Sequence, residues 1–309
     1  MNGLTLKHLR YFEALARHRH FGRAADACSI SQPALSVQIK ELETLIGSPL
    51  IERTKRQIQL TGLGETLVER AREILRSVDE IGDLARTAQG PLTGRLRIGV
   101  IPTVAPYMLP LLIGELNARF PGLDPHPREA VTSKLIEDLE NGLLDTAIVA
   151  LPVSEPTLFE QRLFEEEFVL VRPVADAAKP VPQPGALREM RLLLLEEGHC
   201  FRDQALSFCQ LTPTRSRDLM EASSLTTLVQ MVGAGIGVTL IPEMAVAVES
   251  RSAQVSVARL ATPRPTRVIG MVWRKTSPLS KQLADLSQLV HDFFQARHAE
   301  QHSALRSRG

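Results

Sequence analysis

The sequence has little cysteine: three residues in 309, an odd number that argues against a framework of structural disulfides. It also has no long apolar run. The longest, residues 104–114, contains two prolines and falls short of the ~18 uninterrupted residues that a membrane helix needs. The first twenty residues carry charges where a secretory leader is apolar. These absences lead us to expect a soluble, cytoplasmic chain that does not contact a membrane.

The chain also has almost no excess of one charge over the other, because its formal net charge is only +1. The charged residues are nevertheless unevenly distributed. Residues 1–61 hold nine Lys or Arg against five Asp or Glu. A basic first segment on a near-neutral body indicates that this segment binds a polyanion. The length suggests about two domains, and 44% hydrophobic with 23% charged residues is typical of globular proteins.

The first sixty residues have the pattern of a winged helix-turn-helix. Two short apolar-striped helices precede a third, for which Ser31 is the expected N-cap and Pro33 is tolerated in the first turn. Residues 50–53 and 57–60 alternate as two short strands around a basic turn. The buried stripe of the third helix is expected at Leu35, Ile39, Leu42 and Ile46.

The exposed face of that third helix and the basic hairpin are the expected contacts to double-stranded DNA. Polar side chains near the start of a helix in the major groove can bond base edges, and basic ones reach phosphates. For any single residue an ordinary solvated polar face is the alternative, but the whole arrangement favours DNA binding. The candidates are Gln32, Ser36, Lys40, Arg53, Lys55 and Arg56.

A long helix with a heptad seam is expected from Thr61 to about Ala88, before a breaker cluster at residues 89–94. We interpret it as a dimerising linker, with a core-packed helix as the alternative. The seam consists of Leu67, Ala71, Ile74, Val78, Ile81 and Ala85. The expected domains are therefore 1–61, 62–91 and 92–309.

Beyond the breaker cluster, strand and helix patterns alternate, which predicts an α/β domain with a largely parallel sheet and ligand chemistry at the carboxyl ends of its strands. The last dozen residues are expected to form a tail after a helix over 279–297. Other expected helices cover 106–119, 132–144, 201–209 and 224–232, and the expected strands cover 96–101, 146–151, 168–173, 192–195, 238–241 and 268–273.

Cys200 and Cys209 flank the predicted helix 201–209. Cys200 lies at its start, where the helix N-terminus and a neighbouring imidazolium from His199 would favour thiolate over thiol. Cys209 shares an apolar face with Phe201 and is expected to point inward. Cys200 is thus the expected nucleophile and Cys209 the expected resolving thiol.

The distance between Cys200 and Cys209 along the predicted helix limits how they can form a disulfide. Nine helical steps of about 1.5 Å separate the Cα atoms by roughly 13 Å, whereas a disulfide tolerates about 7 Å. Oxidation could bridge them only by remodelling the backbone. The residues alone leave three alternatives open. The pair could be two core thiols, it could belong with His199 to a metal site that lacks a fourth ligand, or it could serve a thiol peroxidase.

Four N-terminal motifs resemble those of LysR-type transcriptional regulators: AADAC at 24–28, SQPALS at 31–36, ELE at 41–43 and LIERT at 50–54. The resemblance implies a winged helix-turn-helix, a linker helix, and an effector domain like periplasmic binding proteins. That domain would have two α/β subdomains, one near 92–166 with 268–298, the other near 167–267, before a tail at 299–309. It also implies a homotetramer built as a dimer of dimers on paired DNA sites, RNA polymerase as a partner, and a base-facing Pro33.

A second set of motifs resembles the OxyR branch of that family, which senses hydrogen peroxide: GHCFRDQA at 198–205 with Cys209 beyond it, IPTV at 101–104 and REAVT at 128–132. This implies an activator of antioxidant genes that responds to peroxide through a Cys200–Cys209 disulfide. It also implies no enzyme activity, no cofactor and no metal. Phe201 departs from the branch, where a smaller aliphatic residue is common. The implied peroxide pocket consists of Thr103, Thr132, His199, Asp203 and Arg267.

Two functional alternatives to a peroxide-responsive regulator remain at this point. One is a LysR-type regulator that binds a small organic inducer in the effector cleft. The other is the stand-alone thiol peroxidase.

Overall fold

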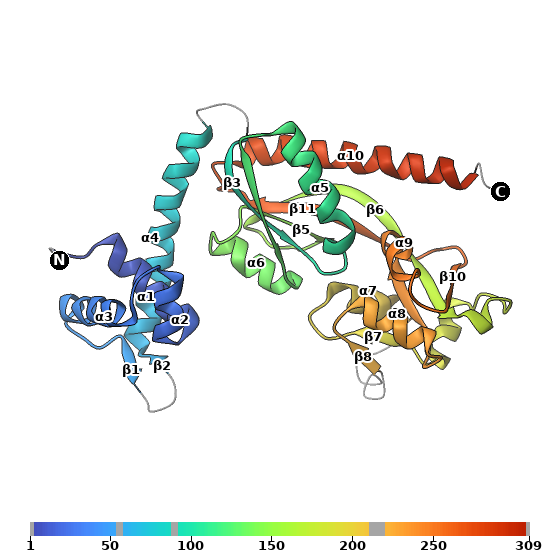
Figure 1. Cartoon of the computed structure of the whole chain (residues 1–309), viewed down its shortest axis with the longest axis horizontal. Helices are drawn as coiled ribbons and strands as arrows, with labels where there is room; N and C mark the ends of the chain where they lie inside the picture. The colour runs from blue at the N-terminus through green and yellow to red at the C-terminus, as the bar shows by residue number, and fades with distance from the viewer. Residues whose placement is uncertain (1–2, 54–57, 88–91, 210–219, 307–309) are drawn as a thin grey trace. The chain divides into compact units, whose positions relative to one another are not determined.

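A computed structural model describes residues 3–53, 58–87, 92–209 and 220–306 (Figure 1). The chain divides into two units, Met1–Ala85 and Arg86–Gly309. Each has its own hydrophobic core, and the second unit has two. The units are described separately.

The first unit is the predicted winged helix-turn-helix. Ser31 caps α3, because its hydroxyl accepts a hydrogen bond from the Ala34 amide at 3.3 Å, and Pro33 lies in the first turn. Leu35, Ile39 and Leu42 are buried on one face of α3, at the predicted spacing. The elements are α1 (Leu6–His18), α2 (Phe21–Ala27), α3 (Gln32–Ile46), β1 (Ile51–Arg53) paired antiparallel with β2 (Ile58–Leu60), and α4 (Gly62–Thr87).

The heptad seam of α4 divides into a buried and an exposed part. Leu67 and Ala71 pack within the first unit, and Ala71 is completely buried. Further along, Ile74 and Ile81 are 44% and 65% exposed and Val78 is half-buried, so this part of the seam is only partly covered within its own unit. The side chain of Ala85 lies outside the described residues.

The second unit has two lobes joined by a mixed sheet (Figure 1). In the first lobe β3 (Gly94–Val100) pairs in parallel with β4 (Leu123–Glu129) and β5 (Thr146–Leu151). β11 (Thr266–Arg274) runs antiparallel to β5 and to β6 (Leu158–Pro173). The expectation of a largely parallel sheet is therefore wrong, because β11 brings the chain back from the second lobe and runs against both neighbours.

β6 serves both lobes with 16 residues, although the sequence predicts only its last third. Its first part pairs with β11, and its last part pairs with β9 (Thr239–Pro242) and β10 (Val255–Arg259). Three consecutive glutamates at 165–167 obscure the strand pattern. The second lobe also contains β7 (Leu193–Leu195), β8 (Met220–Ala222), α7 (Cys200–Phe208), α8 (Leu225–Gly233), α9 (Val246–Glu249), and the 3-10 helices Val174–Asp176, Pro184–Glu189 and Glu243–Ala245.

Three helices complete the first lobe: α5 (Ala105–Arg119), α6 (Thr132–Glu140) and α10 (Ser280–Arg306). α6 packs on β5 and β11, and α10 packs on β6 and β11. The predicted end of the last helix near residue 297 is wrong, because α10 continues to Arg306 through a sequence with no glycine or proline to stop it. Of the helices in the described residues, none combines the length and the apolarity needed to cross a bilayer.

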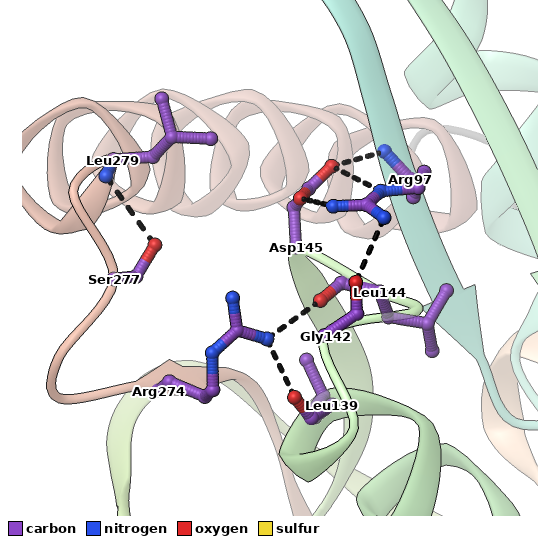
Figure 2. A network of polar contacts seen from close by, with 8 residues as sticks. All are labelled: Arg97, Leu139, Gly142, Leu144, Asp145, Arg274, Ser277 and Leu279. Atoms are coloured by element: carbon purple, nitrogen blue, oxygen red, sulfur yellow. Dashed lines mark hydrogen bonds and ion pairs between the residues drawn. The ribbon is translucent and has the colours of Figure 1, made fainter. Parts of the chain in front are cut away.

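A polar network fixes the amino end of β5 (Figure 2). Asp145 is fully enclosed, and its carboxylate receives hydrogen bonds from the guanidinium and the backbone amide of Arg97, the shortest at 2.6 Å. Arg274 donates to the carbonyl oxygens of Leu139 and Leu144 and so holds the loop between α6 and β5. These contacts hold the amino end of β5 in place. The pocket described next lies at the carboxyl end of β3.

Candidate thiol pocket

A small pocket lies at the carboxyl end of β3, where the start of α6 and the start of α7 meet. The turn after β3 contributes Thr103, α6 begins at Thr132, and α7 begins at Cys200. The pocket therefore joins the first lobe to the second. The lining residues are Ile101, Pro102, Thr103, Val131, Thr132, His199, Cys200 and Phe201.

Cys200 is the first residue of α7, as predicted to within one position. Gly198, with φ of +94°, turns the chain from β7 into α7 in a conformation that side chains beyond glycine rarely adopt. The Cys200 thiol is free and half-buried, and it packs against the core of the first lobe. The backbone N–H groups at the start of a helix have no partners within the helix and can donate hydrogen bonds there.

His199 does not supply the expected imidazolium. It is half-buried, and this burial lowers its pKa, although Glu196 and Glu129 oppose the shift. Burial therefore favours the neutral ring, which can donate from one nitrogen and accept at the other. Its contribution at the pocket is hydrogen bonding rather than positive charge.

Arg267 lies behind Thr103 and not in the pocket lining. Its guanidinium is fully enclosed and pairs with the buried carboxylate of Glu166 at 2.6 Å. Nη1 donates to the Thr103 hydroxyl at 2.7 Å, and Nη2 donates to the Thr103 carbonyl at 3.2 Å. Because the hydroxyl oxygen already accepts from Arg267, its own proton is left to point elsewhere.

Thr132 presents the second hydroxyl of the pocket. Its Oγ1 is buried and has no hydrogen-bond partner among the described residues. A buried hydroxyl without a partner costs about 1–3 kcal/mol. Such an orphan beside a thiol indicates a place for a small polar ligand.

Cys209 lies at the other end of α7, as its C-cap. It is free and completely enclosed in the core of the second lobe. Burial raises the pKa of this thiol to about 11. The prediction that Cys209 points inward is confirmed. Since α7 is helical from Cys200 to Phe208, about 1.5 Å per residue places the two Cα atoms roughly 13 Å apart.

The remaining predicted site residues divide into those near the pocket and those on the first unit. Asp203 lies exposed in the first turn of α7 and is not brought into the pocket lining. Gln32, Pro33 and Lys40 are exposed on α3, and Ser36 is half-buried. Lys55, Arg56 and the side chain of Arg53 lie outside the described residues.

The sequence missed Glu166, because nothing in the chain order connects it with Arg267, 101 positions away. In the described part of the chain, no group of three or more His, Cys, Asp or Glu side chains is placed to hold a metal ion.

A helix-turn-helix unit followed by a two-lobed α/β unit is the arrangement of the LysR family. The family model of bacterial regulatory helix-turn-helix proteins, lysR family, matches residues 6–65. The family model of the LysR substrate binding domain matches residues 89–295. The chain belongs to the LysR family of DNA-binding transcriptional regulators.

Its relatives place it in the OxyR group of that family. The DNA-binding transcriptional dual regulator OxyR of Escherichia coli K12 is 40% identical over 291 residues, 93% of this chain and 95% of the relative. The hydrogen peroxide-inducible genes activator of Haemophilus influenzae is 39% identical over 294 residues, 94% of this chain and 97% of the relative.

Solved structures agree. A full-length OxyR from Pseudomonas aeruginosa with a cysteine-to-aspartate change has a TM-score of 0.72 and 35% identity, covering 94% of this chain and 95% of that one. A peroxide-bound OxyR from Corynebacterium glutamicum with a cysteine-to-serine change has a TM-score of 0.67 and 36% identity, covering 97% and 95%.

Proposed function

We propose that this chain is a transcriptional activator that responds to hydrogen peroxide through Cys200 and Cys209. The observation that carries the proposal is the pocket lined both by Cys200, at the start of α7, and by Thr132, whose buried hydroxyl has no hydrogen-bond partner in the described part of the chain. Peroxide is small and polar, and it can both donate and accept hydrogen bonds, so it suits a pocket with neutral His199 and two threonine hydroxyls.

The first step is the oxidation of Cys200. Its thiolate attacks one peroxide oxygen, the O–O bond breaks, and the leaving oxygen departs as hydroxide and takes up a proton to become water. Cys200 is left as a sulfenic acid. Charge develops on the leaving oxygen, and the proton of the Thr103 hydroxyl, oriented by Arg267, and that of Thr132 stabilise it.

The second step joins the two sulfurs. The Cys209 sulfur attacks the sulfenic sulfur of Cys200, the S–O bond breaks, and hydroxide leaves with the Cys209 proton as a second water. Overall two thiols and one peroxide give one disulfide and two waters. A Cα separation of roughly 13 Å exceeds the about 7 Å that a disulfide tolerates. α7 must therefore unwind, and the oxidised effector unit has a different shape.

The change in shape of the effector unit would affect DNA binding through contacts between the copies of the chain. We infer a dimer of dimers in which the exposed Ile74 and Ile81 on α4 meet another copy, while Gln32, Pro33 and Ser36 face bases and Lys40, Arg53, Lys55 and Arg56 face phosphates. Altered contacts within the tetramer would then change how RNA polymerase engages the promoters of antioxidant genes.

Intact-mass measurement under non-reducing conditions tests the proposal. One equivalent of peroxide should remove two hydrogens, located by peptide mapping at Cys200 and Cys209. Cys200→Ser should keep specific DNA binding and lose the peroxide-dependent change in footprint, whereas Cys28→Ser, in the first unit, should respond as the native chain does.

Three results would contradict it. They are an unchanged mass with a footprint that responds to a metabolite instead, rapid turnover of peroxide without specific DNA binding, and a preserved peroxide response in Cys200→Ser.

A further inference from the structure

Phe201 follows Cys200 directly and packs into the opposite lobe. Cys200 contacts the core of the first lobe, whereas the Phe201 ring is only 2% exposed within the core of the second. The ring has two defined partners. Its centroid lies 4.8 Å from that of Phe168 at an interplanar angle of 58°, and the Arg267 guanidinium carbon lies 5.4 Å from its centroid. Both geometries are those of favourable ring and cation–π contacts.

Both partners are held by the scaffold and not by α7. Phe168 belongs to β6, where it pairs with Pro242 of β9, and its amide donates to the Pro265 carbonyl at 2.9 Å. Arg267 belongs to β11 and is fixed by Glu166 and Thr103. The ring of Phe201 is thus held between two groups that have no need to move when α7 unwinds.

The position next to Cys200 makes these contacts part of the bridging step. To bring the two cysteine Cα atoms from roughly 13 Å to within about 7 Å, α7 has to lose its helical geometry, and we take its first turn, which contains Phe201, to rearrange with it. Each disulfide that forms would therefore break the ring contact with Phe168 and the contact with Arg267.

We propose that Phe201 is a positioning residue that locks α7 in the helical, reduced form and so sets how easily oxidation at Cys200 proceeds to the disulfide. This inference rests on the proposed function, because it concerns the second step of that reaction. A leucine at 201 keeps an apolar side chain but lacks the ring. We expect the opening of α7 to become about tenfold easier, within the range that one ring pair and one cation–π contact supply together.

Amide hydrogen exchange of the reduced, full-length protein measures this opening without any oxidant. Phe201→Leu should raise exchange of the α7 amides about tenfold and leave those of α8 unchanged, although α8 packs in the same core. Phe168→Leu removes the partner ring without altering α7 and should act in the same direction. Phe159→Leu, which removes a more exposed ring in tilted contact with Trp273 in the first lobe, is the control and should change nothing in α7.

The rate of disulfide formation and the reduction potential of the cysteine pair should both change with the opening of α7. In Phe201→Leu the disulfide should form about tenfold faster from the sulfenic acid, and the two-electron potential of the pair should fall by about 30 mV, the equivalent of a tenfold change in equilibrium. Trapping the sulfenic acid in Cys209→Ser, with and without Phe201→Leu, isolates the first step.

The outcomes separate the two proposals. If no sulfenic acid forms at Cys200 in Cys209→Ser, the proposed function fails. If it forms, three results would each overturn the lock at Phe201: unchanged exchange in α7, exchange that rises equally in α7 and α8, or faster bridging that comes entirely from faster sulfenic acid formation.

Discussion

Arg267 and Thr103 lie 164 positions apart in the sequence, yet the arginine Nη1 donates to the threonine Oγ1 over 2.7 Å in a buried site. The same guanidinium pairs with Glu166 and contacts the ring of Phe201. One side chain therefore orients a pocket hydroxyl, neutralises a buried carboxylate and supports the start of α7. Stability and reactivity should consequently respond differently to changes at neighbouring positions.

Thr132→Val should separate the two properties. The Thr132 hydroxyl is buried and has no hydrogen-bond partner among the described residues, so its removal should cost no stability and should add up to about 1–3 kcal/mol, the penalty of the orphan group. Oxidation of Cys200 should nevertheless slow at least tenfold, because a donor to the leaving oxygen is lost. Stopped-flow oxidation and denaturant unfolding measure the two effects. Trp273, the single tryptophan of the chain, is buried in the first lobe and reports its unfolding.

Thr146→Val is the matched control for that variant. The Thr146 hydroxyl is also buried in the first lobe but donates to the Val272 carbonyl at 3.0 Å, away from the pocket. Its loss should cost about 1–3 kcal/mol of unfolding free energy and leave the oxidation rate unchanged. The assignment of Thr132 as a donor would be wrong if both variants oxidised at the native rate.

Arg267→Met should destabilise the second unit strongly. It leaves the Glu166 carboxylate enclosed without its counter-charge, and breaking a buried ion pair in this way costs about 3–5 kcal/mol. Adding Glu166→Gln should restore part of that loss, because the stranded charge disappears. A double-mutant cycle from denaturant unfolding should give a coupling of about 1–3 kcal/mol. Additive effects of the two changes would argue against the ion pair.

Stability of the second unit should depend on pH through His199. Burial holds the folded-state pKa of this imidazole below its usual value near 6.5. The unfolded chain then binds a proton more readily than the folded one, so stability is complete above about pH 6.5 and falls as the pH drops through the folded-state pKa. His199→Gln should flatten this part of the profile of unfolding free energy against pH. An unchanged slope would show that other groups cause it.

Cys209 should resist alkylation in the reduced protein. Its pKa of about 11 leaves little thiolate at pH 8, and the side chain is enclosed. In a Cys28→Ser background, iodoacetamide should modify Cys200 much faster than Cys209, at least 100-fold by mass mapping over time. Unfolding in urea should abolish most of that difference. Equal rates in the folded protein would contradict the placement of Cys209 in the core.

Helix starts and strands that depend on neighbouring residues could be predicted from the sequence. The Ser31 cap predicts the start of α3, and an unbroken apolar run predicts β5 over Thr146–Leu151 to the residue. β4 was missed because Pro125 and Pro127 argue against a strand. Those prolines are tolerated since β4 is at the edge of the sheet and its outer side needs no amide donors.

Non-local contacts account for what the sequence could not predict at the site. The resemblance to the OxyR branch predicts that Thr103, Thr132, His199 and Arg267 belong to one site. The lowered pKa of His199, however, depends on burial that only the folded chain provides. The pairing of Arg267 with Glu166 and the contact between Phe201 and Phe168 join strands and helices from distant parts of the chain. No periodicity or spacing within one segment encodes them.

The ion pair between Arg97 and Asp145 in Figure 2 lies just before the start of β5, whereas the thiol pocket follows the carboxyl end of β3. Under the function proposed above, the side chains that meet the stimulus are therefore different from those that anchor the strands. Substitutions of pocket side chains should then alter the response to the stimulus and leave this anchor intact.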